Sequence, residues 1–324
     1  MFCRQMVTGQ RESAQVLSDE QTGEVIASIC VCTYRRPEGL RRLLESFTRQ
    51  IDAPPFEVVI VDNDPALSAR EVAESFRDRL SVRYLNDPAP CLATIRNRSI
   101  QEARGAFLAF ADDDEEVVDT WLGAHHRVLL QTGAVAASGP VRYEFDERVP
   151  PGIRQCRLFK RPDVPAGRDL PWFWAFTGNA YVRRSALPDQ RQPFREHYGS
   201  TGGEDVDCFK KMVDAGGRLV MSGPAALVIE YREYDRARYV WVLRRALRNG
   251  GNLADMQWAH ETRRAKFILA LRSLKQGLAQ AWRARPLAKT DSQAFVEQSI
   301  DASVNFGRFL SVFGYRYPEY GARR

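Results

Sequence analysis

Apolar and polar positions alternate along the first two thirds of the chain in a pattern typical of successive strands and helices. Short, nearly continuous apolar runs predict strands at 25–32, 56–62, 82–85, 106–112 and 134–139. Between them, apolar residues recur at helical spacing, which predicts helices around 40–47, 69–76, 95–103 and 121–128. Strands that are apolar on both sides are typical of a parallel sheet covered on both faces. We therefore expect an α/β fold with a mainly parallel, Rossmann-like sheet flanked by helices.

The remainder of the chain is less regular. Val206, Phe209 and Val213 form a helical stripe, and the runs RLVMS and ALVIE predict two closing strands. From about residue 236 the pattern is helical. These features predict a mobile N-terminal arm at 1–24, a main domain at 25–235 and a helical C-terminal region at 236–324.

Composition narrows the class of protein. No uncharged apolar run approaches the ~18 residues of a membrane span, and the N-terminus has no apolar signal region. The six cysteines are scattered without metal-ligand spacing, which favours free thiols in a reducing compartment. We therefore expect a cytoplasmic protein.

The positive charge is concentrated near the C-terminus. The net charge is +6, and the segment 261–289 alone carries +7, so the rest of the chain is close to neutral at −1. The apolar residues of the segment 261–289 share one helical face, and they are Phe267, Ile268, Leu271, Leu274, Leu278 and Trp282. Such a helix can lie in an anionic membrane interface, or it can pack on the main domain with a solvated basic face. No nucleic-acid-binding motif accompanies the charge, and no nucleic-acid partner is expected.

Polar clusters follow three of the predicted strands. They read CTYRRP after the first strand, VDNDP after the second and ADDDEE after the fourth. In an open α/β sheet, ligands bind beyond the carboxyl ends of the strands. We therefore expect these three loops to meet at one crevice.

The run Asp112-Asp113-Asp114 has two interpretations. Acidic residues at a helix N-terminus interact favourably with the helix dipole, and Asp119 or Thr120 could cap the helix that follows. Alternatively, the D-x-D spacing suits Mg²⁺ or Mn²⁺, which prefer carboxylate oxygens together with substrate phosphates. A bound cation would also explain how crowded carboxylates stay ionised.

Five sequence blocks, taken in order, resemble family 2 glycosyltransferases. They are ASICVCTYRRPEGLRRLLESF, FEVVIVDNDP, IRNRSIQEARGAFLAFADDDE, TGNAYVRR and GGEDVDCFKKMVDAGGRL, and they cover roughly 25–235. The CTYRRP, DNDP and DDDE stretches are most similar to bacterial exopolysaccharide enzymes of the succinoglycan type. The resemblance implies a GT-A fold, a nucleotide-sugar donor, a divalent metal and inversion at the anomeric carbon.

The resemblance also implies roles for residues of the nucleotide site. Thr33 and Tyr34 match positions that contact the nucleoside, and Arg36 lies in the same block. Asp62 or Asn63 matches the position that reads the base, usually uracil, so a UDP-sugar is the expected donor. Many members have two acids there, and Asn63 departs from that pattern. Arg96 matches a basic position that often faces the nucleotide.

Further residues are implied for the metal, the sugar and the base. Asp112 and Asp114 match the metal-binding D-x-D, with Asp114 the favoured ligand and Asp112 or Asp113 near the ribose. Gly178 and Asn179 lie where the sugar or the acceptor is held. Glu204 and Asp205 match the acidic pair that supplies the catalytic base.

The chemistry supports a distant acid independently of the resemblance. An attacking sugar hydroxyl must lose its proton, and a carboxylate within hydrogen-bond reach can accept it. That carboxylate has to lie opposite the leaving diphosphate, which favours an acid far along the chain from the metal ligands, such as Asp205. The alternative is structural: a glycine turn followed by an acidic helix start, with Glu204 and Asp207 on the dipole.

These observations predict an inverting, metal-dependent glycosyltransferase of polysaccharide biosynthesis, acting on a glycan or a lipid-linked saccharide. Peripheral contact with the inner face of the cytoplasmic membrane through 261–289 is part of this hypothesis. One alternative is a nucleotidyltransferase, for which TYRRPEG is a poor phosphate loop. Another is a non-catalytic nucleotide-sugar-binding module. Trp172, Phe173 and Trp174 could stack on an acceptor sugar or belong to the core.

Overall fold

The computed structural model describes residues 25–89, 91–160, 163–199 and 201–317, and the predicted arm at 1–24 lies outside these ranges. The chain divides into two compact units, which are considered separately. The first comprises Met1–Val141, Asp163–Glu196 and Cys208–Ile229, and the second Arg142–Pro162, His197–Asp207 and Glu230–Arg324, each as far as it is described. Three segments of the range 25–235, at 142–162, 197–207 and 230–235, therefore belong to the second unit.

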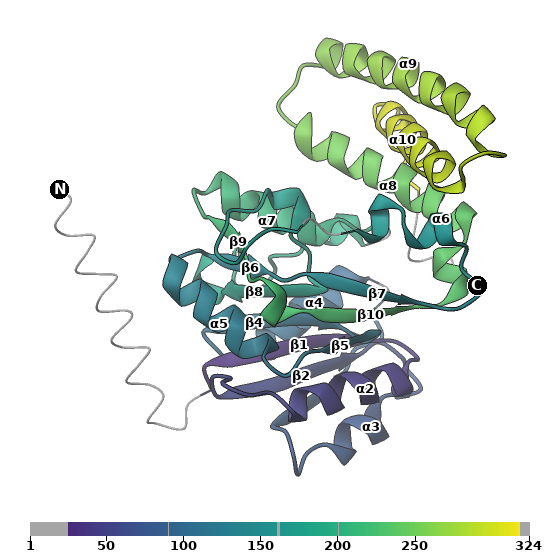
Figure 1. Cartoon of the computed structure of the whole chain (residues 1–324). Helices are drawn as coiled ribbons and strands as arrows, with labels where there is room; N and C mark the ends of the chain where they lie inside the picture. Colours follow the sequence, from purple (N-terminus) through teal and green to yellow (C-terminus); the bar gives the residue numbers. More distant parts are fainter. Residues whose placement is uncertain (1–24, 90, 161–162, 200, 318–324) are drawn as a thin grey trace. The chain divides into compact units, whose positions relative to one another are not determined.

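A seven-stranded sheet in the order β3-β2-β1-β4-β8-β6-β9 forms the centre of the first unit (Figure 1). Its strands are β1 (Ala27–Thr33), β2 (Phe56–Asp62), β3 (Val82–Asn86), β4 (Phe107–Asp112), β6 (Ala136–Ser138), β8 (Asn179–Arg183) and β9 (Leu219–Met221). The pairs β1–β2, β1–β4, β2–β3 and β6–β9 are parallel. Strand β8 runs antiparallel to β4 and β6. The mainly parallel sheet is thus confirmed, with one reversed strand.

Three strands were not predicted from the sequence. A separate three-stranded sheet has the order β5-β10-β7, with β5 at Glu115–Val117, β7 at Val141–Phe145 and β10 at Val228–Arg232. The segments EEV and VRYEF interrupt their apolar residues with charges, so neither forms the apolar run by which the other strands were predicted. Strand β8, NAYVR, was also missed, because its apolar run is only three residues long and follows an aromatic segment that showed no strand pattern. Pairing with neighbours distant in sequence, rather than local pattern, makes these segments strands.

Helices cover both faces of the large sheet. They are α2 (Pro37–Thr48), α3 (Arg70–Ser75), α4 (Leu92–Glu102), α5 (Trp121–Thr132) and α7 (Glu204–Asp214). On one face, Cys30 and Phe110 pack in a cluster with Ile100 of α4 and Phe209 of α7. Because successive strand residues face opposite ways, Phe107 faces the other side, where its ring contacts His126 of α5. Phe47 of α2 stacks on Trp121 of α5, with ring centroids 5.9 Å apart.

The second unit is built mainly from helices, as the sequence predicted for the C-terminal region. They are α6 (Pro151–Arg154), α8 (Tyr239–Gln257), α9 (Arg263–Leu287) and α10 (Ser292–Ser311), and α10 packs against the other three. Its core includes Ile153, Phe159, Val242 and Ile300. None of the helices within the described ranges has the length and apolar character needed to cross a bilayer.

The buried face of α2 allows a test of this core. Leu44 is fully buried, and Leu44→Ala should lower the free energy of unfolding by about 2–5 kcal/mol, because lost burial adds to the cost of a cavity. Urea denaturation followed by circular dichroism measures the change. Ile51→Ala, at an exposed position just after the same helix, serves as the control and should change stability by less than about 0.5 kcal/mol. Equal midpoints for the two variants would contradict this packing.

Candidate functional site

Three strand ends meet at one edge of the large sheet. Thr33 of β1 lies opposite Asp62 of β2 in the parallel register, and Cys32 of β1 lies opposite Asp112 of β4. The loops that follow these strands carry most of the polar residues singled out in the sequence. Strand register therefore brings together groups that are about 30 to 80 positions apart along the chain.

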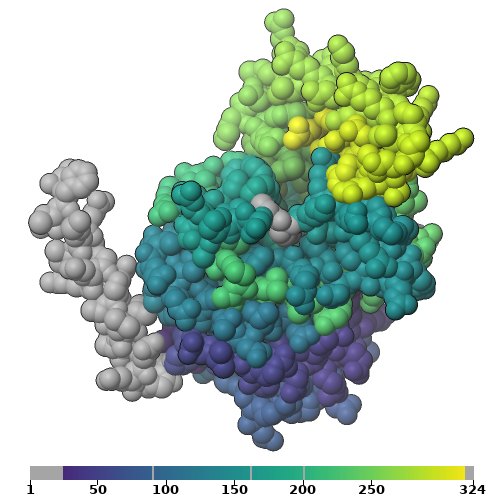
Figure 2. All heavy atoms as spheres, in the orientation of Figure 1, coloured from purple at the N-terminus to yellow at the C-terminus, as the bar shows by residue number. Residues whose placement is uncertain are grey.

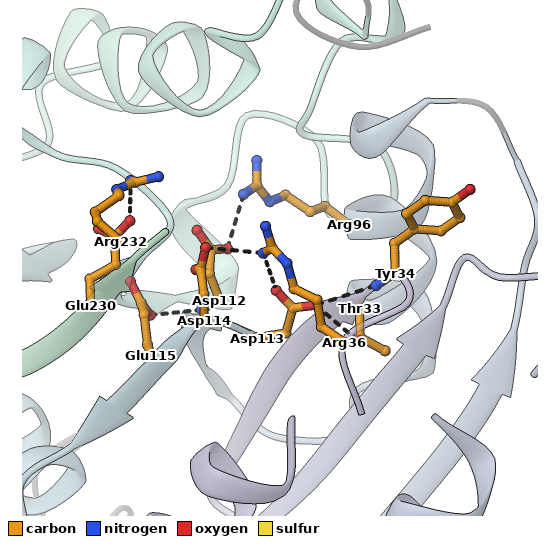
Figure 3. A network of polar contacts seen from close by, with 10 residues as sticks. All are labelled: Thr33, Tyr34, Arg36, Arg96, Asp112, Asp113, Asp114, Glu115, Glu230 and Arg232. Carbon is orange, nitrogen blue, oxygen red and sulfur yellow. Dashed lines mark hydrogen bonds and ion pairs between the residues drawn. The ribbon is translucent and has the colours of Figure 1, made fainter. Parts of the chain in front are cut away.

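Asp113 ties the loop after β4 to the loop after β1. Its carboxylate accepts hydrogen bonds from Thr33 Oγ1 at 3.0 Å, from the Tyr34 backbone N–H at 3.3 Å and from Arg36 Nη1 at 2.8 Å (Figure 3). The residue is only 5% exposed. Burial raises the pKa of Asp113 to about 6, against the attraction of Arg36, and the neighbouring charge of Asp114 acts in the same direction as burial. This buried carboxylate therefore holds the loop after β4 against the loop after β1.

Two arginines offset the negative charge of the other two acids of the cluster, Asp112 and Asp114. Arg36, the residue before α2, also donates from Nη1 to Asp114 Oδ2 at 3.0 Å. Arg96, buried on α4, donates from Nη2 to Asp112 Oδ1 at 3.3 Å. In Figure 3 both guanidinium groups point toward the aspartates. The positive charge that three adjacent carboxylates require thus comes from two other segments of the chain.

The donor set at this edge fits a hard divalent cation in the presence of a substrate. Asp112 and Asp114 are both partly exposed, so their oxygens are not sealed into the core. Within the described ranges, no three acidic, histidine or cysteine side chains are grouped to hold a metal ion by themselves. Mg²⁺ commonly takes one or two carboxylates and completes its shell with waters and phosphates. A site here would therefore depend on the phosphates of the substrate.

Asp62 and Asn63 differ sharply in their surroundings. The carboxylate of Asp62 is fully buried and accepts from the backbone N–H groups of Asp64 and Ala69 and from Tyr84 Oη, at 2.8–3.0 Å. Asn63 is half-buried, and its amide Nδ2 donates to two main-chain carbonyls in the loop after β3, at 2.8 and 2.6 Å. Asp62 therefore shapes the turn, and Asn63 is the more accessible of the two.

The side chain of Tyr34, in the loop after β1, is exposed to solvent. Its side chain is 41% exposed, and the Arg35 guanidinium lies over its ring, 5.0 Å from the centroid. Arg35 has a φ of +54°, which is uncommon for a residue with a side chain, and it donates from Nε to Asp64 Oδ1 at 3.2 Å. The strained residue thus links the loop after β1 to the loop after β2.

Gly178 directly precedes β8 and Asn179 is its first residue, and both are buried. Asn179 Oδ1 accepts a hydrogen bond from Trp121 Nε1 at 2.9 Å, and it lies 2.8 Å from His125 Nε2. Its Nδ2 donates to the carbonyls of Pro140 and Ala226. A Cβ at Gly178 would come within 2.9 Å of a Glu115 carboxylate oxygen. Asn179 therefore joins β8 to α5 and to two loops.

Two buried histidines extend this network. Ser222 Oγ contacts His125 Nδ1 at 2.6 Å, and His126 Nδ1 contacts Tyr181 Oη at 2.9 Å. Burial lowers the pKa of each histidine to about 4, and for His126 the nearby Arg183 adds to the effect. The sequence placed both on a helix but offered no signal for their partners, because those partners lie at least 54 positions away.

The aromatic run at 172–174 forms a short 3₁₀ turn rather than an extended segment. Trp172 packs against the buried core of the first unit, with Lys210 Nζ 5.9 Å from its ring centroid. Phe173 and Trp174 remain exposed. Trp172 therefore packs against the core, whereas Phe173 and Trp174 face solvent, and stacking on an acceptor sugar stays a prediction for these two.

In the second unit, a glycine turn leads into the acidic start of α7. Gly202 and Gly203 have φ values of +68° and +98°, which glycine adopts without strain. Glu204 is buried, whereas Asp205 is partly exposed and accepts from the Val206 backbone N–H at 2.8 Å. Asp205 is thus the more accessible member of the pair.

Asn252 of α8 contacts this glycine turn, and no sequence pattern predicted that contact. Its Nδ2 donates to the Gly202 carbonyl at 2.6 Å and lies 3.4 Å from the Thr201 carbonyl. A Cβ at Gly203 would approach the same amide within 2.8 Å. An asparagine in a helix interior has no local signature of such a long-range contact, so only the tertiary structure identifies it.

Comparison with protein families and curated proteins places the chain among known sequences. A family model described as Glycosyl transferase family 2 matches residues 28–189. The succinoglycan biosynthesis protein ExoM of Rhizobium meliloti (strain 1021) is 33% identical over 254 residues, covering 77% of this chain and 81% of that protein. Glycosyltransferase AglE of Haloferax volcanii is 26% identical, covering 60% of this chain and 64% of its own length.

Solved structures show the same fold. Staphylococcus aureus TarS 1–349 in complex with UDP-GlcNAc superimposes with a TM-score of 0.51 at 18% identity, and the match covers 90% of each chain. The complex of the same fragment with UDP gives a TM-score of 0.51 at 16% identity. At this level of identity the likeness concerns the fold, and it confirms the GT-A-like arrangement predicted from the sequence.

The buried histidines predict an acid-sensitive stability. A histidine with a pKa of about 4 in the folded state and about 6.5 when unfolded stabilises the fold above pH 6.5, and this contribution is lost as pH falls toward 4. The free energy of unfolding of the wild type should fall as the pH is lowered from 7 to 4.5. In His126→Gln this fall should be smaller, by at most about 1.4 kcal/mol for each pH unit. Urea denaturation at several pH values measures this slope. His260→Gln, at an exposed position, is the control, and an identical slope in both variants would contradict the prediction.

Proposed function

The chain belongs to glycosyl transferase family 2 and is a glycosyltransferase, and from this premise we propose an inverting, metal-dependent enzyme that uses a nucleotide-sugar donor. The expected donor is a UDP-sugar. The expected acceptor is a glycan or a lipid-linked saccharide in polysaccharide biosynthesis, in keeping with the similarity to a succinoglycan biosynthesis protein. We expect it to act in the cytoplasm, at the inner face of the cytoplasmic membrane.

One observation carries this proposal. The register of β2, β1 and β4 gathers the Thr33–Arg36 loop, the turn at Asn63 and the acids 112–114 at a single sheet edge. The fold class binds ligands at such an edge. Exposed Tyr34 offers a ring for a nucleoside, and Arg36 and Arg96 offer positive charge for phosphate. The combination suits a nucleoside diphosphate.

The acids of the site divide into distinct proposed roles. Asp113 positions the loops through its contacts with Thr33, Tyr34 and Arg36, whereas Asp112 and Asp114 would hold Mg²⁺ or Mn²⁺. The chemistry that a bound cation supplies is neutralisation of charge on the departing diphosphate. Arg36 and Arg96, already paired with these carboxylates, would re-partition between the aspartates and the phosphates when a donor binds.

Asp205 is the proposed general base. The acceptor hydroxyl transfers its proton to this carboxylate as the oxygen forms its bond to the anomeric carbon, and the diphosphate leaves from the opposite side, which inverts that carbon. An ordinary carboxylate is a far weaker base than an alkoxide, so proton transfer comes late in bond formation. Asn252 and the glycine turn position the start of α7 for this role. Gly178 and Asn179 remain proposed for the sugar or the acceptor, Asn179 as a positioning residue.

Family membership favours glycosyl transfer over nucleotidyl transfer, the rival reaction considered from the sequence. The remaining alternatives concern which residues act and with which donor. Two substitutions separate them, one in the acidic loop and one at the start of α7.

Asp205→Asn should lower kcat by about 10²- to 10⁴-fold, because it removes the proton acceptor while keeping the shape of the side chain. The Kd of the donor should be unchanged. Radiolabelled sugar transfer and calorimetric donor binding measure the two quantities. Asp214→Asn, at the exposed end of the same helix, should behave as wild type. Normal turnover by Asp205→Asn would remove this residue from the catalytic role.

Asp114→Ala should abolish the Mn²⁺ dependence of donor binding, because one of two carboxylate ligands is lost. We expect the Kd for a UDP-sugar in Mn²⁺ to rise on the order of tenfold or more. Calorimetry with UDP-, GDP- and dTDP-sugars, each with and without Mn²⁺, measures this and identifies the base. Asp119→Ala, in the exposed turn beyond β5, is the control. Equal wild-type affinity with and without Mn²⁺ would exclude the proposed metal site.

A further inference from the structure

Helix α9 packs on α10 with its small residues rather than its large ones. The buried positions of α9 are Ala270, Ser273, Gly277 and Ala284. These residues lie on one stripe of the helix. Ala270, Gly277 and Ala284 are seven positions apart, and Ser273 follows Ala270 by three. Helix α9 contacts α10 along its length. Small side chains let the two helices approach closely without using the apolar face that the sequence suggested.

The large apolar side chains of α9 are left exposed. They are Phe267, Ile268, Leu271, Leu278 and Trp282, with exposed fractions of 42–71%. Four of them follow the spacing of one helical stripe, separate from the stripe of small residues. These five residues are called here the α9 apolar face. Figure 2 shows long side chains of the light green C-terminal segment standing out at the surface. A gathering of large apolar groups on one helix marks an interaction surface.

Basic side chains surround the α9 apolar face. The segment 261–289 carries eight lysines and arginines and one acid. Within the described part of the chain, no basic residue of this segment forms an ion pair with a carboxylate. Their charge is therefore directed to solvent or to a partner. The partner surface must accept apolar side chains and carry negative charge.

We propose that the α9 apolar face docks on the surface of an anionic lipid bilayer, with the helix axis lying in the plane of the interface. Phe, Leu and Trp side chains enter the boundary between headgroups and acyl chains, while Arg and Lys contact the anionic headgroups. A second copy of the chain fits this surface poorly, because two copies would bring +7 against +7. The small-residue stripe stays on α10, so docking requires no rearrangement of the second unit.

This proposal deepens the proposed function, which puts the enzyme at the inner face of the cytoplasmic membrane, and it is argued from separate observations on α9. Docking would hold the enzyme where lipid-linked saccharides are found. Vesicle binding is measured without donor or acceptor, so its failure and a failure of glycosyl transfer are distinguishable.

Flotation of the full chain with vesicles tests the docking. Binding to phosphatidylglycerol mixed with phosphatidylcholine should exceed binding to phosphatidylcholine alone by on the order of tenfold or more, and salt should weaken it. The double variant Leu278→Ser/Trp282→Ser should lose binding by a similar factor, as should Arg272→Glu/Lys275→Glu. Ile51→Ser and Arg77→Glu, at exposed positions of the first unit, are the matched controls and should bind as wild type.

Trp282 supplies a second readout. Its fluorescence should shift to the blue when the wild-type chain meets anionic vesicles, and Trp282→Phe should keep vesicle binding while losing that part of the shift. Circular dichroism and thermal unfolding establish that each variant is folded. Equal flotation of wild type with both lipid mixtures, or unchanged binding of both double variants, would overturn the proposal. So would a wild-type dimer that the double variants convert to monomers without any vesicle binding.

Discussion

Three adjacent carboxylates at the end of a buried strand repel one another, and the site depends on charge brought from elsewhere to hold them together. Arg36 comes from the loop before α2 and Arg96 from α4, so the cluster at 112–114 forms only when β1, β4 and α4 are already assembled. Asp113 then joins the loops through its hydrogen bonds with Thr33, Tyr34 and Arg36, which favour its charged form, while burial acts against that form and raises its pKa. The charge of one loop thus links three segments of the chain.

Burial divides the polar residues singled out in the sequence into those that are enclosed by other elements and those that solvent can reach. Asp62 and Asn179 are buried completely, and each uses its polar atoms on partners from several elements. Buried polar groups of this kind cost free energy unless all their hydrogen bonds are made, so they specify one arrangement of loops. Tyr34, Asn63 and Asp205 remain partly exposed. The fully buried residues therefore hold the arrangement of the chain around them, and solvent can reach the partly exposed ones.

Helix α9 reverses the usual relation between side-chain size and burial. Its small residues pack on α10 and its large apolar residues face outward, beside basic side chains that form no ion pair with any carboxylate of the described residues. Exposing large apolar groups costs free energy in water, and a surface that offers both acyl chains and anionic headgroups recovers it. This is why the composition of the segment alone, basic and apolar together, was compatible with two opposite packings.

The sequence by itself determined the class of the molecule: apolar periodicity identified β1, β2, β4 and the helices between them, and five blocks in order identified the family. It also located the acidic loop, because Asp112–Asp114 follow directly on an apolar run. It did not find β5, β7, the partners of His125 or the role of Asn252, since each depends on contacts across dozens of positions that leave no local pattern. Only the tertiary structure decided which face of α9 is buried, and that Asp62 and Asp113 use their carboxylates to hold loops in place. Periodicity records that a side chain is apolar or charged, whereas burial is decided by what the rest of the fold places against it.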